Sequence, residues 1–114
     1  MTIQTNISLL KDLANGDKAF ELQMLELIHA ELALEIPRML PLFHEKNYPE
    51  LFRIAHQMKT SVSYVFDQEF FQLITQIEQA SKQNQASPEL KQNIEYLDQQ
   101  INEILQAIDN LASL

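Results

Sequence analysis

Residues 87–111 read SPELKQNIEYLDQQINEILQAIDNL, and this stretch decides the fold. Its apolar residues recur every three or four positions, at Leu90, Ile94, Leu97, Ile101, Leu105, Ile108 and Leu111. That spacing keeps them on one face of an α-helix, because a helix turns by about 100° per residue. Ser87 followed by Pro88 and Glu89 is typical of a helix start. The stretch therefore predicts a long helix that packs one narrow stripe along its neighbours.

Working outward from this helix, breaking residues divide the rest of the chain into four more helical runs. A short run over 7–14 is expected to end at Asn15 and Gly16, which suit the left-handed conformation of a helix C-cap. Asp17 can then cap a longer second helix with its side chain. The first run is too short to span a bundle, so we expect it to be an accessory N-terminal helix.

Prolines disturb the end of the second helix. Pro37 and Pro41 each lack a backbone N–H, so we expect a kink or break between residues 35 and 42. The third helix should run from about residue 49 to 66, and Asp67 should cap the fourth. Four long amphipathic helices with short connections predict an all-α protein, an antiparallel four-helix bundle with a short additional N-terminal helix.

The composition agrees with one helical domain spanning residues 1–114. The chain is 46% hydrophobic but contains one Gly and four Pro, which leaves few turn residues for a β-sandwich or barrel. It contains no Cys, which excludes a disulfide framework, a thiolate metal site and a Cys nucleophile. A transmembrane helix needs about 20 continuous apolar residues, and neither this nor a signal peptide is found, so we expect a cytoplasmic protein.

The net charge of −8 bears on the partners. Nucleic acid and anionic membranes attract basic surfaces, and no cluster of Lys or Arg interrupts the acidic composition. We therefore expect neither as a partner.

The strongest functional signal lies in residues 55–66, AHQMKTSVSYVF. By helical geometry Ile54 and Met58 lie opposite His56, so the imidazole should point away from the core, with Lys59 on the same surface. An exposed imidazole has a nucleophilic nitrogen near neutral pH, and a neighbouring ammonium attracts an anionic phosphoryl group. On geometry alone, an ordinary solvated histidine is the simplest alternative.

Residues 55–61, AHQMKTS, resemble the signature of histidine phosphotransfer domains, which is roughly AHxLKGS. Residues 77–82, IEQASK, stand at the spacing of the LExxxR pattern in that family's next helix. Residues 24–43, MLELIHAELALEIPRMLPLF, resemble the family's second helix and the connection after it. The resemblance covers the chain from about Ile7 to Leu111.

The resemblance implies a helical bundle that carries a phosphoryl group between receiver domains of response regulators and hybrid histidine kinases. His56 would be the phosphoaccepting histidine through Nε2, and Lys59 would neutralise the phosphoryl oxygens. Glu78 would accept the Nδ1 proton. The chain would need no cofactor of its own, and it has no nucleotide-binding signature, so we expect a carrier and not a kinase. Magnesium is expected only in the receiver partner.

Phe52, Thr60 and Ser63 are the candidate docking residues around His56. Phe52 precedes the histidine by one turn and is the candidate apolar anchor. Thr60 replaces the family's usual glycine and adds bulk where a receiver approaches, and Phe66 replaces a small residue at the rim. The threonine predicts a narrower set of partners. Both departures also support the alternative of a docking module that inhibits a receiver or kinase without transfer. A monomer is expected, because it leaves this face open.

A metal enzyme is a further alternative. Glu26 and His29 have the Glu-x-x-His spacing of di-iron bundles, but such a site needs two of these pairs. In the third helix Arg53 stands where the second glutamate is required. We therefore interpret His29 and His44 as ordinary packed or solvated histidines.

Overall fold

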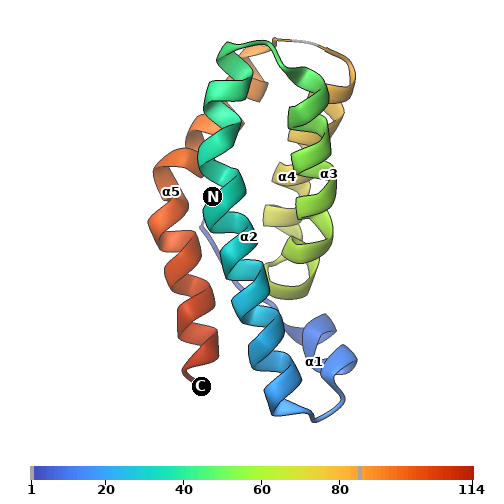
Figure 1. Ribbon diagram of the computed structural model, residues 1–114, viewed down its shortest axis with the longest axis vertical. Coiled ribbons are helices and arrows are strands. Elements are labelled where there is room, and N and C mark those ends of the chain that lie inside the picture. The colour runs from blue at the N-terminus through green and yellow to red at the C-terminus, as the bar shows by residue number, and fades with distance from the viewer. Residues whose placement is uncertain (1, 85) are drawn as a thin grey trace.

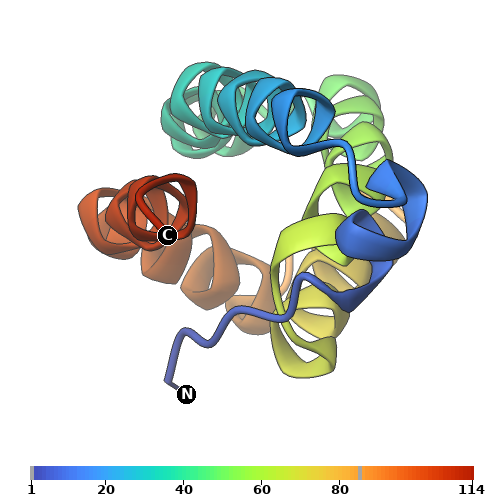
Figure 2. The same cartoon turned by 90° about the horizontal axis from the view of Figure 1, so that it is seen from below.

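The computed structural model describes residues 2–84 and 86–114, and five helices make up most of this part of the chain (Figure 1). They are α1 (Ser8–Ala14), α2 (Lys18–His44), α3 (Tyr48–Val65), α4 (Gln68–Lys82) and α5 (Pro88–Ala112). Helices α2 to α5 run alternately up and down, and each packs against the next, with α5 returning to α2. Figure 2 shows α1 beside one end of this antiparallel bundle, where it packs on α2 and α3. The predicted fold class is confirmed.

Side-chain caps set the starts of the four long helices, and those at Asp17, Asp67 and Ser87 were predicted. Asp17, Asn47, Asp67 and Ser87 each accept a hydrogen bond from the backbone N–H three residues further on. Such caps satisfy N–H groups that have no partner within the helix. At the end of α1, Asn15 adopts the left-handed conformation, with φ 50° and ψ 45°. Local sequence therefore marks the starts of the four long helices and the end of α1.

A kink or break was predicted between residues 35 and 42, and the break is wrong, because α2 continues through both prolines. Pro37 and Pro41 lie on its exposed side, while Ile36 and Met39 are fully buried on the other. A proline inside a helix removes one backbone hydrogen bond and crowds the preceding turn. Burial of apolar side chains on the inner face offsets that cost, since tertiary packing supplies most of a helix's stability in proteins.

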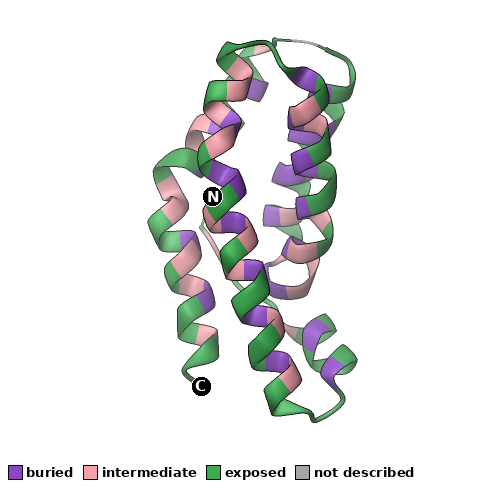
Figure 3. Cartoon of the chain, in the orientation of Figure 1, coloured by how far each residue is buried: buried purple, intermediate pink, exposed green. Residues whose placement is uncertain are grey.

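The hydrophobic core lies between the inward faces of α2 to α5 (Figure 3). Along α5 the buried apolar side chains are Leu90, Ile94, Leu97, Ile104 and Ile108. The stripe is therefore shifted from the predicted one, because Ile104 is fully buried while Ile101 and Leu105 are half-buried. These residues lie within one turn of each other, and the packing of α5 against its neighbours decides which of them faces inward.

The extended segment before α1 forms backbone hydrogen bonds with the junction between α3 and α4. The backbone N–H of Asn6 donates to the carbonyl of Val65 at 2.8 Å, and that of Asp67 donates to the carbonyl of Gln4 at 3.0 Å. Phe66 lies between these two bonds with its ring buried. Phe66, which departs from the family pattern at the end of this helix, therefore belongs to the core. Its ring packs inward because the junction turns it toward the core.

Candidate functional site

His56 lies on the outward face of α3, with its side chain 64% exposed. Ile54, Ala55 and Met58 are buried on the opposite side of the helix. The orientation predicted from helical geometry is confirmed. The site is therefore open to a macromolecular partner and is not enclosed in a cleft.

Glu78 of α4 joins the histidine to the lysine one turn later. Nδ1 of His56 lies 2.6 Å from Oε2 of Glu78, and Nζ of Lys59 donates to Oε1 at 3.0 Å. The Glu78 side chain is only 3% exposed, so its carboxylate is held in place by packing as well as by these bonds. A carboxylate can only accept hydrogen bonds, so Nδ1 carries the proton and the lone pair of the imidazole lies on Nε2.

The charge state of Glu78 depends on its two partners. Burial acts to raise the pKa of this carboxyl, but the hydrogen bonds from His56 and Lys59, together with the lysine charge, outweigh it. The pKa of Glu78 is therefore lowered from its ordinary value. Near neutral pH the group is a carboxylate, which is the form that binds both neighbours.

Two aromatic rings surround the histidine and the lysine. The ring of Phe52 stacks on the His56 imidazole, with 5.6 Å between centroids and 18° between planes. Nζ of Lys59 lies 5.9 Å from the centroid of Phe71 on α4. Phe52 is half-buried, so it supports the imidazole from the side as well as offering apolar surface. The apolar spacing of Phe70, Phe71, Ile74 and Ile77 predicts that all four form the buried face of this helix, but Phe71 is half-buried at the edge of the core. Neighbouring helical residues are only about 100° apart, so the position of Phe70 does not decide from sequence whether Phe71 faces the core or its edge.

The other predicted docking residues follow His56 along α3. Thr60 is exposed, and Ser63 is half-buried with its hydroxyl donating to the Thr60 carbonyl at 2.6 Å. Ser63 also lines a surface pocket of about 310 Å³, together with Leu9 of α1 and Phe71. The structure therefore places these candidates on one continuous surface with the histidine.

A charged network between α2 and α3 forms the opposite flank of the site. Arg53 donates to the side-chain oxygen of Gln57 at 2.8 Å and lies 3.5 Å from Glu35 of α2, which also accepts from Arg38 at 2.9 Å. Arg53 pairs with Glu50 in addition. Sequence reasoning missed this network. The spacing of Glu35 to Arg38, and of Glu50 to Arg53, is a detectable signal for pairs within one helix but not for the link across helices.

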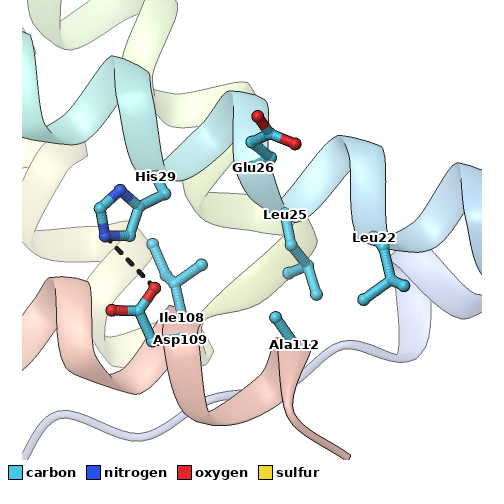
Figure 4. Close-up of a pocket in the computed structure, with 7 residues that line it drawn as sticks. All are labelled: Leu22, Leu25, Glu26, His29, Ile108, Asp109 and Ala112. Atoms are coloured by element: carbon cyan, nitrogen blue, oxygen red, sulfur yellow. Dashed lines mark ion pairs between the residues drawn. The ribbon is translucent and has the colours of Figure 1, made fainter.

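The Glu-x-x-His pair of α2 lies elsewhere, at a pocket of about 340 Å³ between α2 and α5 (Figure 4). Nε2 of His29 is 3.4 Å from Oδ1 of Asp109, whereas the Glu26 carboxylate points away from both. Within residues 2–84 and 86–114, no group of three or more His, Cys, Asp or Glu side chains is placed to hold a metal ion. His29 thus makes an ordinary partly exposed contact between helices.

Comparison of the chain with protein-family models, with curated proteins and with solved structures finds no match in any of the three. Across the described residues, no helix combines the length and the apolar character that a bilayer span requires. The candidate site is therefore interpreted from its own geometry.

Proposed function

We propose that this chain is a histidine phosphocarrier of a multistep two-component phosphorelay. His56 accepts a phosphoryl group from the phospho-aspartate of one receiver domain and passes it to another. The observation that carries the proposal is the contact of buried Glu78 with Nδ1 of an exposed histidine, which leaves the Nε2 lone pair in an open surface. An ordinary solvated histidine does not need a buried carboxylate to fix its tautomer.

The chemistry is nucleophilic substitution at phosphorus. The Nε2 lone pair of His56 forms a P–N bond as the P–O bond to the partner's aspartate breaks and the aspartate leaves as a carboxylate. The Nδ1 proton stays on the ring, which becomes positively charged. Glu78 accepts the hydrogen bond from that Nδ1–H and stabilises the new charge. The reverse sequence transfers the group to the second receiver.

Lys59 supplies the cation beside the reacting group. Its ammonium binds Glu78, and its side chain is 27% exposed. A lysine has a flexible four-carbon stem, so the ammonium can turn toward the phosphoryl oxygens while Glu78 keeps its bond to Nδ1. The metal ion that phosphoryl transfer requires belongs to the receiver in this proposal. The carrier is then a cytoplasmic monomer that has no catalytic activity of its own.

A docking module that binds a receiver or kinase and inhibits it is the second candidate. The exposed Thr60, one turn from His56, favours it because a branched side chain there restricts close approach. The two candidates differ in one observable, since only the carrier forms a phosphohistidine.

The test is transfer of labelled phosphate from phosphorylated receiver domains of the source organism to this chain. Wild type is compared with His56→Gln and with the matched control His44→Gln, since His44 is also exposed and lies outside the site. The carrier predicts a label that survives base, is lost in acid and disappears only in His56→Gln. Receivers that bind without transferring would support the inhibitory module instead.

A further inference from the structure

We propose that the outward face of α2 pairs two copies of this chain in a reversible antiparallel dimer. This face, the α2 seam, consists of Leu27, Ala30, Leu34, Pro37 and Pro41. None of these residues belongs to the His56 site. The inference therefore goes beyond the proposed function and does not depend on it.

The α2 seam differs in composition from the outer surface of α4. Every exposed residue of α2 from Leu27 to Pro41 is apolar, whereas the exposed residues of α4 are all Gln, Glu or Lys. Leu27 and Leu34 are 58% and 65% exposed. Single exposed leucines are ordinary, but a continuous apolar face marks a surface that another molecule covers.

The spacing of the α2 seam favours a helix as the covering element. Its five residues follow one another at intervals of three, four, three and four. This is the repeat of the a and d positions along which two helices pack in a coiled coil. The inner face of α2 packs on α3 and α5, and the bundle itself does not cover this second stripe. The stripe is therefore available to a helix of another molecule.

Two charged residues at the edge of the α2 seam point to a second copy of α2 as that helix. Glu31 and Arg38 lie seven residues apart on the side facing α3. Oε2 of Glu31 is buried and has no hydrogen-bond partner within residues 2–84 and 86–114. The Arg38 guanidinium binds Glu35 at 2.9 Å and lies 3.6 Å from Glu50, and its five N–H groups leave donors to spare. A buried oxygen without a donor is costly, and turning outward to an arginine of a second copy relieves that cost.

The same charges decide the orientation of the two helices. In an antiparallel pair, Glu31 of each copy faces Arg38 of the other, so the two-fold axis forms the contact twice. In a parallel pair, Glu31 would face Glu26 of the other copy, and the like charges would repel. The antiparallel axis passes close to Leu34, because this residue lies midway between Glu31 and Arg38. The side chain of Leu34 therefore meets its own copy at the centre of the seam.

The size of the α2 seam sets the strength of the dimer. From Leu27 to Pro41 the helix is about 22 Å long and about 10 Å wide. This face is well below the roughly 800 Å² per partner of a standard interface. The dimer is therefore weak, and the monomeric carrier proposed above is the form present at low concentration.

Sedimentation equilibrium of the full chain between about 10 μM and about 1 mM tests the dimer. The mean mass should rise with concentration from that of the monomer toward twice that value. Leu34→Asp should raise the dissociation constant by at least about tenfold, because it places two carboxylates at the axis. Leu9→Asp is the matched control, since Leu9 is 49% exposed on α1 and lies outside the seam, and it should change the constant by less than about twofold. A mass that stays monomeric throughout, or equal effects of the two variants, would overturn the proposal.

Single cysteines test the orientation, because the chain contains no Cys of its own. Leu34→Cys should form a disulfide-linked dimer under mild oxidation, since the axis brings the two positions within the roughly 7 Å between Cα atoms that a disulfide spans. Leu27→Cys should stay unlinked, because antiparallel helices hold its two copies about 20 Å apart. Both leucines are exposed, so each variant should keep the wild-type helicity and melting temperature. Efficient linkage at both positions, or in Leu27→Cys alone, would overturn the antiparallel pair, and linkage at neither would overturn the seam.

Discussion

Oε2 of Glu78, an almost fully buried carboxylate, lies 2.6 Å from Nδ1 of His56, a largely exposed imidazole. The contact links a buried side chain of α4 to an exposed side chain of α3. It fixes which ring nitrogen carries the proton and therefore which one is available as a nucleophile. The proposed function depends on this relationship more than on any other contact in the protein.

Removing the Glu78 carboxylate should slow phosphoryl acceptance. Groups that orient a reactive histidine typically contribute about 10- to 100-fold, and we expect a loss in that range for Glu78→Ala. Glu78→Gln keeps an oxygen that can accept from Nδ1 and should retain most of the rate. The measurement is the rate of label transfer to each variant. Equal losses in the two variants would show that charge, and not orientation, is what the site requires.

The lowered pKa of Glu78 predicts a specific dependence of stability on pH. The pKa in the folded protein lies below the unfolded value, so the contribution of this group is complete above the unfolded pKa and is lost as the pH falls through the folded pKa. Urea unfolding at several pH values, from neutral down to about 3, measures it. Other carboxylates contribute too, so the relevant quantity is the difference from Glu78→Gln, which should diminish on acidification. A constant difference would contradict the assignment.

Phe52 should act on the site more than on the fold. Its ring is half-buried and stacks on the imidazole, so Phe52→Ala should lower the free energy of unfolding by about 1 kcal/mol. Transfer to His56 should fall, since the ring also offers apolar surface to a partner. Phe52→Leu retains the apolar volume without the stacked ring and separates these two effects. Transfer at the wild-type rate in Phe52→Ala would show that Phe52 has no role at the site.

Thr60→Gly tests whether the threonine restricts the choice of partners. Thr60 is exposed one turn from His56, so the change should preserve transfer or extend it to further receivers. Glycine is a slightly poorer helix former than threonine, so the change should lower the free energy of unfolding by only about 0.3 kcal/mol. Transfer rates across a panel of receivers give the answer. A collapse of transfer at unchanged folding would mean that Thr60 makes a required contact.

The core of α5 can be tested with two neighbouring residues. Ile104 is fully buried, so Ile104→Ala should lower the free energy of unfolding by about 2 to 5 kcal/mol. Leu105 is half-buried, and Leu105→Ala should be clearly less destabilising. Chemical denaturation of both variants measures the difference. If Leu105→Ala were the more destabilising variant, the apolar stripe predicted from the sequence, which contains Leu105 and not Ile104, would be correct.

Local signals explain most of what could be predicted from the sequence. Side-chain caps act within one turn, so Asp17, Asp67 and Ser87 marked helix starts that the structure contains. The outward direction of His56 followed from the periodicity of its own helix. Its contact with Glu78 was expected only from the resemblance to a family, because that contact joins two helices whose alignment periodicity does not specify.

Contacts between helices account for what was missed. The continuity of α2 through Pro37 depends on the packing of its inner face, which outweighs a local breaking signal. Phe71 approaches Lys59, and Arg53 approaches Glu35, because neighbouring helices lie in a particular register. Sequence periodicity predicts which face of each helix is buried. It does not predict how far two packed helices are shifted along each other.

The engagement of both Glu78 oxygens limits how the modified state can be imitated. Acidic substitution is a common way to simulate a phosphorylated side chain, but His56→Asp would set one carboxylate against another that is buried. It would also remove the ring N–H that Glu78 binds, leaving Lys59 as the principal donor to that carboxylate. For this protein a stable phosphohistidine analogue that retains the imidazole ring is the appropriate mimic, and a carboxylate at position 56 reports on electrostatic repulsion instead.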